Sequence, residues 1–151
     1  MLAEACTAAG IPDGVVNVVL GPGRSVGQSL VGHSDVNMVS FTGSTQVGVN
    51  VMRTAAERAC RTHLELGGKA ACLVFDDVDV ERVAGQLAAA ATIISGQQCT
   101  AARRVLVHAA KFESMKVALS RALSSLVVAP GDSPGAQVGP LIDAASRERV
   151  A

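Results

Sequence analysis

The chain has 151 residues, the length of one ordinary domain, and its 13 basic and 13 acidic residues cancel to a formal charge of zero. This balance excludes the strongly basic surface that binding to nucleic acid or to an anionic membrane requires. Because 49% of the residues are hydrophobic and only 2% are aromatic, we expect Ala and Val to build the core of closely packed α/β layers.

The first 60 residues alternate predicted helices with predicted strands. Gly10 ends the first helix, and Ser44 or Thr42 is placed to cap the last one. The expected elements are helices at 2–9, 24–31 and 44–59 and strands at 15–20 and 36–43. This order is typical of a parallel sheet with crossover helices.

The second half continues the mixed pattern. Apolar segments at 62–66 and 70–75 flank a tight turn at 67–69. An acidic stretch then begins a helix that is apolar on nearly all sides, so we expect that helix to be buried. A strand at 103–108, an amphipathic helix at 111–126 and a Pro- and Gly-rich loop at 129–143 follow. Neither end of the chain resembles a domain edge, so we expect a piece of a longer protein.

The cysteines show no C-x-x-C spacing, which predicts neither a disulfide framework nor a metal site. They lie at Cys6, Cys60, Cys72 and Cys99. Residues 1–4 lack the features of a signal peptide, and the most apolar window, 83–95, is too short to cross a bilayer. We therefore expect a cytoplasmic protein in a reducing compartment.

The segment FTGSTQVG, residues 41–48, has the pattern of a phosphate site. A strand ends at Phe41, Gly43 permits a tight turn, and a helix begins at Ser44. Free N–H groups and the positive end of the helix dipole then face a ligand. The spacing G-x-x-x-x-G differs from the dinucleotide pattern G-x-G-x-x-G, so an ordinary strand-to-helix turn stays the alternative.

Glu65 and Cys99 are the candidate reactive side chains. A glutamate within the apolar segment THLEL is costly to bury, and burial raises its pKa into the range of a general base. The alternative is a partly exposed glutamate on an edge strand. Cys99 follows Gly96 among small and polar residues, which predicts a thiol exposed on a turn. Its alternative is a small hydrophobic core residue.

Together, FTGSTQVG, LELGGK and GQQC resemble the aldehyde dehydrogenase superfamily, with Glu65 and Cys99 separated by 34 positions (99 − 65). The segment GPLID is also characteristic of this family. The sequence around Glu65 and Cys99 is most similar to the branch that oxidises aminoaldehydes and betaine aldehyde. The resemblance implies an α/β fold. Residues 1–63 would form the C-terminal part of a Rossmann-like, parallel-sheet cofactor domain, and residues 64–151 the start of the α/β catalytic domain.

The resemblance also implies roles for individual residues. Cys99 attacks an aldehyde, Glu65 activates water to hydrolyse the resulting thioester, and the Cys99 N–H supplies half of an oxyanion hole. The cofactor is NAD or NADP. Its implied binding residues are Gly21, Gly27, Phe41, Thr42, Gly43, Ser44, Thr45, Val47, Gly48, Leu66 and Gly67. Full-length family members are expected to form homo-oligomers.

Several family features are missing, because the chain corresponds to roughly a third of a family member. The upstream Pro-Trp-Asn oxyanion donor and most ribose contacts are absent, so we expect the 151 residues alone to be inactive. Two alternatives stay open: an acylating relative, which Glu65 disfavours, and a non-catalytic remnant that binds nucleotide or a full-length partner. The remaining cysteines and the histidines are expected to be structural or surface residues: Cys6, Cys60, Cys72, His33, His63 and His108.

Overall fold

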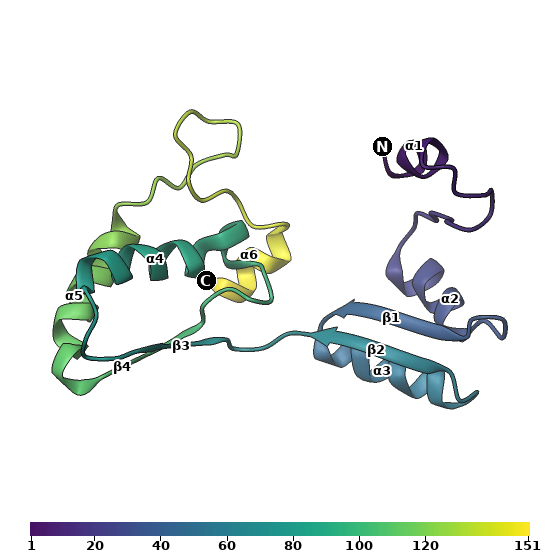
Figure 1. The fold of residues 1–151 in the computed structure, drawn as a ribbon, viewed down its shortest axis with the longest axis horizontal. Helices are drawn as coiled ribbons and strands as arrows, with labels where there is room; N and C mark the ends of the chain where they lie inside the picture. Colours follow the sequence, from purple (N-terminus) through teal and green to yellow (C-terminus); the bar gives the residue numbers. More distant parts are fainter. The chain divides into compact units, whose positions relative to one another are not determined.

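The computed structural model describes residues 1–151, which form two units, Met1–Leu66 and Gly67–Ala151 (Figure 1). The first unit contains α1 (Leu2–Ala8), the π-helical η1 (Gly23–Gly27), α2 (Gln28–Gly32), β1 (Met38–Gly43), α3 (Thr45–Ala56) and β2 (Arg61–Leu66). The second contains β3 (Ala71–Val74), α4 (Val80–Thr92), η2 (Ile93–Gly96), β4 (Arg104–Val107), η3 (Ala109–Lys111), α5 (Phe112–Ser124) and α6 (Ala144–Val150). None of these helices combines the length and apolarity needed to span a membrane.

Each unit is built on one pair of parallel strands joined by a crossover helix. In the first unit β1 pairs with β2 from Met38 opposite Arg61 to Gly43 opposite Leu66, and α3 connects them. In the second, β3 pairs with β4, and α4 lies in the connection. The predicted α/β fold with parallel strands is confirmed.

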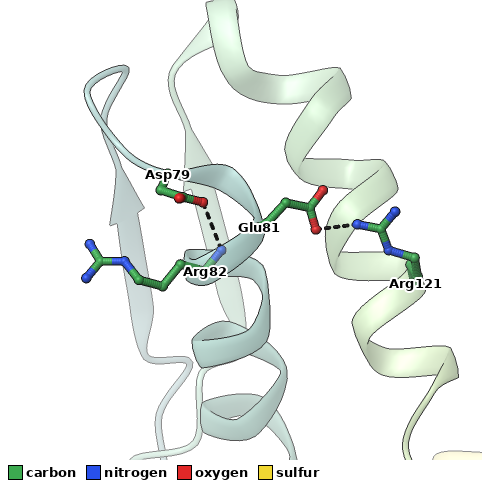
Figure 2. Close-up of polar contacts among 4 residues, drawn as sticks. All are labelled: Asp79, Glu81, Arg82 and Arg121. Carbon is green, nitrogen blue, oxygen red and sulfur yellow. Dashed lines mark hydrogen bonds and ion pairs between the residues drawn. The ribbon is translucent and has the colours of Figure 1, made fainter.

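Polar caps start the crossover helices where the sequence predicts helix beginnings. The Ser44 hydroxyl accepts a hydrogen bond from the Val47 N–H at 3.3 Å, so Ser44 and not Thr42 caps α3. In Figure 2 the Asp79 carboxylate accepts a hydrogen bond from the backbone N–H of Arg82 at 3.1 Å, at the start of α4. A cap of this kind stabilises a helix by about 1 kcal/mol.

The core of the second unit lies between its strands and the adjacent helices α4 and α5 (Figure 1). Its buried members are Val74, Ala84, Leu87, Met115 and Ala118. Across the whole chain, every buried hydrophobic residue except Leu87 and Met115 is Ala or Val, as predicted. An ion pair between Glu81 and Arg121 also joins α4 to α5 (Figure 2). Because both side chains are exposed, that pair adds little to stability.

Two local predictions are wrong. Residues 15–20 form no strand, because β1 pairs only with β2 and no other segment of the chain supplies hydrogen bonds to them. Helix α4 is buried on one face only: Ala84 and Ala88 are covered, whereas Ala89 and Ala90 are exposed. In both cases apolar composition alone does not determine burial, which requires a packing partner.

The predicted domain boundary, between residues 63 and 64, falls inside β2. Strand β2 stays hydrogen-bonded to β1 as far as Leu66, which keeps Glu65 in the first unit. The assignment of the two units to a cofactor domain and a catalytic domain stays a prediction.

Candidate active site

A largely apolar cavity of about 450 Å³ lies in the first unit, among η1, α2, β1 and α3. This volume is within the range of small-molecule sites. Its lining contains three of the predicted cofactor residues, Gly27, Phe41 and Val47. The other lining residues are Gly23, Arg24, Gln28, Val31, Asn50, Val51 and Thr54. The cavity therefore combines apolar walls with a few polar groups that could orient a ligand.

The glycines around η1 have two different functions. A Cβ placed on Gly23 or Gly27 meets nothing within 4 Å, so the backbone there faces open space along the cavity. A Cβ on Gly21 would instead lie 2.3 Å from Cγ2 of Val26, and Gly21 does not line the cavity. The structure thus places Gly27 in the cavity wall and Gly21 in the packing that precedes it.

Strand β1 continues through Thr42 and Gly43, past the end predicted at Phe41, and Ser44 leads directly into α3 at Thr45. None of these four residues lines the cavity, although Phe41 and Val47 on either side of them do. A Cβ on Gly43 would lie 2.4 Å from Cζ of Phe41, so the absence of a side chain lets the Phe41 ring cover the end of β1. The first turn of α3 carries backbone N–H groups without intrahelical acceptors, including that of Thr45. These N–H groups and the helix dipole favour an anion at this position.

Gly48 and Leu66 lie at the contact between α3 and β2 and outside the cavity lining. Gly48 is buried, and a Cβ on it would lie 2.4 Å from Cδ2 of Leu66. Glycine at this position therefore allows the helix to approach the strand closely. Gly67 is exposed and begins the second unit.

Glu65 lies near the end of β2, opposite Thr42 of β1, and its side chain is 66% exposed. Of the two alternatives left open by the sequence, the structure shows the exposed strand glutamate. Nε2 of His63 lies 3.6 Å from Oε1 of Glu65, and Nδ1 of the same ring lies 3.3 Å from the Ser40 hydroxyl. Because His63 and Glu65 are two positions apart on a strand, the sequence predicts that they share a face. The contact of His63 with Ser40 depends on the pairing of β1 with β2, which the sequence does not show.

Cys99 lies on a turn in the second unit, and it is the only exposed cysteine of the four. The exposed thiol that the sequence predicts is confirmed. The turn follows three residues with left-handed backbone, Ile94 (φ 48°), Ser95 (φ 54°) and Gly96 (φ 71°). Directly after the turn, Ala101 and Ala102 are buried. Cys99 therefore lies on an exposed turn between this left-handed segment and two buried alanines.

The left-handed conformation of Ile94 leads to a stability prediction. A β-branched residue is strained in this region, at a cost of roughly 1–2 kcal/mol, whereas Asn tolerates it. Ile94 is 67% exposed, so little packing is lost when its side chain is replaced. We expect Ile94→Asn to raise the free energy of unfolding by about 1 kcal/mol in urea denaturation.

The matched control is Ile93→Asn, since Ile93 is also exposed but has an ordinary φ of −54°. We expect this control to be neutral or destabilising. Equal effects of the two substitutions would show that residue 94 is not strained.

Comparison with known proteins decides the family. The family model described as "Aldehyde dehydrogenase family" matches residues 1–151, the whole chain. The chain belongs to the aldehyde dehydrogenase family. It is 42% identical over 142 residues to lactaldehyde dehydrogenase of Escherichia coli, covering 93% of this chain and 30% of that protein. It is 36% identical to aminoaldehyde dehydrogenase 1 of Pisum sativum, covering 99% and 30%.

The structural comparison agrees with this aldehyde dehydrogenase assignment. The crystal structure of Staphylococcus aureus betaine aldehyde dehydrogenase with NAD+ matches with a TM-score of 0.91 and 32% identity, covering 99% of this chain and 30% of that one. The chain thus spans about 30% of the length of the relatives it matches. Since aminoaldehyde, betaine aldehyde and lactaldehyde enzymes are all similar at 32–42% identity, these values do not favour one branch.

Proposed function

We propose that this chain supplies the cofactor turn, the general base and the nucleophile for oxidation of an aldehyde to a carboxylic acid with NAD or NADP. The observation that carries the proposal is the exposed thiol of Cys99, since the other three cysteines are partly buried. A nucleophile must be reachable by its substrate, and its position after a left-handed turn meets that requirement.

The cavity of the first unit suits the adenosine part of the cofactor. Its apolar walls and the open backbone at Gly23 and Gly27 fit a flat ring, and the start of α3 fits the pyrophosphate. We place the nicotinamide end near Leu66 and Gly67, as the family resemblance implies. When bound, the cofactor accepts the hydride from the substrate.

The protein residues perform the remaining chemistry. The Cys99 thiolate forms a bond to the aldehyde carbon, and the carbonyl electron pair moves to oxygen, where the Cys99 N–H can stabilise it. Once hydride has left that carbon, a thioester joins substrate and Cys99. Glu65 removes a proton from a water molecule, which attacks the thioester carbon. The C–S bond then breaks and releases the acid.

Cofactor placement is tested by filling the cavity. In Gly27→Leu the new side chain occupies space along the lining without a clash at its Cβ. We expect NAD+ affinity, measured by isothermal titration calorimetry, to fall roughly tenfold, equivalent to about 1.4 kcal/mol. The control is Gly131→Leu, since Gly131 also has open space around it but lies outside the cavity. Equal affinities of the two variants would contradict this placement.

An activity assay of the 151-residue chain alone tests whether it is a complete catalyst. We expect the 151 residues to show no sustained aldehyde oxidation, because a single missing oxyanion donor costs roughly 3–4 kcal/mol of transition-state stabilisation. The assay follows absorbance of the reduced nicotinamide with a panel of aldehydes, on protein that is monodisperse in size-exclusion chromatography. Turnover that disappears in Cys99→Ala would show that the segment is complete. Nucleotide binding without turnover in any longer form would favour the non-catalytic alternative.

The substrate branch and the cellular location are further parts of the proposal. The sequence around Glu65 and Cys99 resembles the aminoaldehyde and betaine aldehyde branch, which favours an aldehyde of this class as the substrate. All four cysteines are free thiols, which supports a reducing, cytoplasmic location. Association of complete subunits into homo-oligomers is proposed from the family resemblance.

A further inference from the structure

The GPLI segment, residues 139–142, contacts the turn that carries Cys99, although more than 40 positions separate them. The Ser95 hydroxyl donates a hydrogen bond to the Gly139 carbonyl oxygen at 2.9 Å. The Ile142 N–H donates to Oε1 of Gln97, also at 2.9 Å. Both lengths are those of good hydrogen bonds, and they join two sequence motifs to which the proposed chemistry gives no common role.

The turn needs such support. Ile94 and Ser95 are non-glycine residues in the left-handed region, followed by Gly96 in the same region. Backbone of this kind persists only where its surroundings hold it. Besides the two hydrogen bonds to the GPLI segment, Nε2 of Gln97 donates to the Ile94 carbonyl at 3.3 Å, and the Arg103 guanidinium donates to the Gly96 carbonyl. These contacts converge on the residues directly before Cys99.

The GPLI segment is itself fixed at both ends. On one side Val138 forms a bridge with Val128. On the other, the Asp143 carboxylate accepts a hydrogen bond from the Ser146 N–H at 2.7 Å and caps α6. Hydrogen bonds from Ser146 hold the pKa of Asp143 below its ordinary value. The GPLI segment is therefore held in place on both sides and can restrain the turn that it contacts.

We propose that Ser95 and Gln97 are positioning residues, which hold the Cys99 turn in its reactive conformation through hydrogen bonds to Gly139 and Ile142. This inference rests on the proposed role of Cys99 as the nucleophile. It assigns to the GPLI segment a part in the active site that requires no contact with substrate.

The test compares two adjacent glutamines. Gln97→Leu removes both hydrogen-bonding groups at similar side-chain size, whereas the Gln98 side chain makes no hydrogen bond, so Gln98→Leu is the matched control. Amide hydrogen exchange of the 151-residue chain is followed by NMR at Ile142, whose N–H donates to Gln97. Losing a hydrogen bond of ordinary strength should accelerate exchange at this amide by roughly two- to tenfold in Gln97→Leu. Gln98→Leu should leave the rate unchanged.

Two further measurements address function and folding. Gln97→Glu keeps the acceptor oxygen for the Ile142 N–H, so it should restore the slow exchange at Ile142. In a complete subunit that contains this segment, Gln97→Leu should slow the first turnover, seen as the burst of reduced cofactor, by roughly tenfold or more. NAD+ affinity should not change, because the cavity lies in the first unit.

The results separate this inference from the proposed function. Unchanged exchange in Gln97→Leu overturns the inference, and so does faster exchange at Ile142 that leaves the burst rate at its original value. Exchange is measured without substrate, so it tests the hydrogen bonds between the turn and the GPLI segment independently of the chemistry. If Cys99→Ala retains activity, the proposed nucleophile is wrong, but the positioning role of these hydrogen bonds in the turn is still tested by exchange.

Discussion

Replacing Cys99 with alanine is expected to abolish aldehyde oxidation in a complete subunit that contains this segment. Without the sulfur atom no covalent intermediate can form, so the rate should fall by several orders of magnitude. The measurement is absorbance of the reduced nicotinamide with a panel of aldehydes. Affinity for NAD+ should survive, because Cys99 does not belong to the unit that contains the cavity.

The control for this variant is Cys6→Ala. Cys6 is a partly buried residue of α1, where alanine is well tolerated, so activity should be retained. Near-normal turnover of Cys99→Ala would remove this residue from the mechanism. Loss of activity in both variants would indicate a general effect of cysteine replacement on folding.

Replacing Glu65 with glutamine is expected to slow hydrolysis of the thioester much more than hydride transfer. Glutamine keeps the size of the side chain but cannot accept the proton from water, and losing a general base costs about 10²–10⁴-fold in rate. Rapid-mixing measurements should show a burst of reduced cofactor followed by slow turnover. The exposed position of Glu65 at the end of β2 leaves room for the water molecule it is proposed to activate.

Glu57→Gln provides the comparison in the same unit. Glu57 is exposed at the C-terminal end of α3 and makes no ion pair, so its replacement should alter neither the burst nor the steady state. If Glu65→Gln loses its burst as completely as its steady-state rate, Glu65 acts before hydride transfer. It would then be the base that deprotonates the thiol.

Features determined by short stretches of sequence could be predicted. The capping of α3 by Ser44 follows from a side chain and an N–H three positions apart. The exposure of Cys99 follows from Gly96 and from the polar neighbours of the cysteine. The parallel direction of the strands follows from the alternation of helices and strands, since a crossover helix returns the chain in the same direction.

Features that depend on distant partners could not be predicted. Residues 15–20 have strand composition but no neighbouring strand in this chain, and α4 has a covering helix on one side only. Gln28 and Asn50 line the cavity because α2 and α3 pack side by side, and no local sequence motif predicts that packing. The hydrogen bonds of Ser95 and Gln97 join segments more than 40 positions apart.

The close contact of Gly48 with Leu66 links two parts of the first unit mechanically. Ser44 begins α3 one turn before Gly48, and Leu66 directly follows Glu65 in β2. Any residue larger than glycine at position 48 would therefore force the Leu66 side chain, or the end of the strand that carries it beside Glu65, to shift.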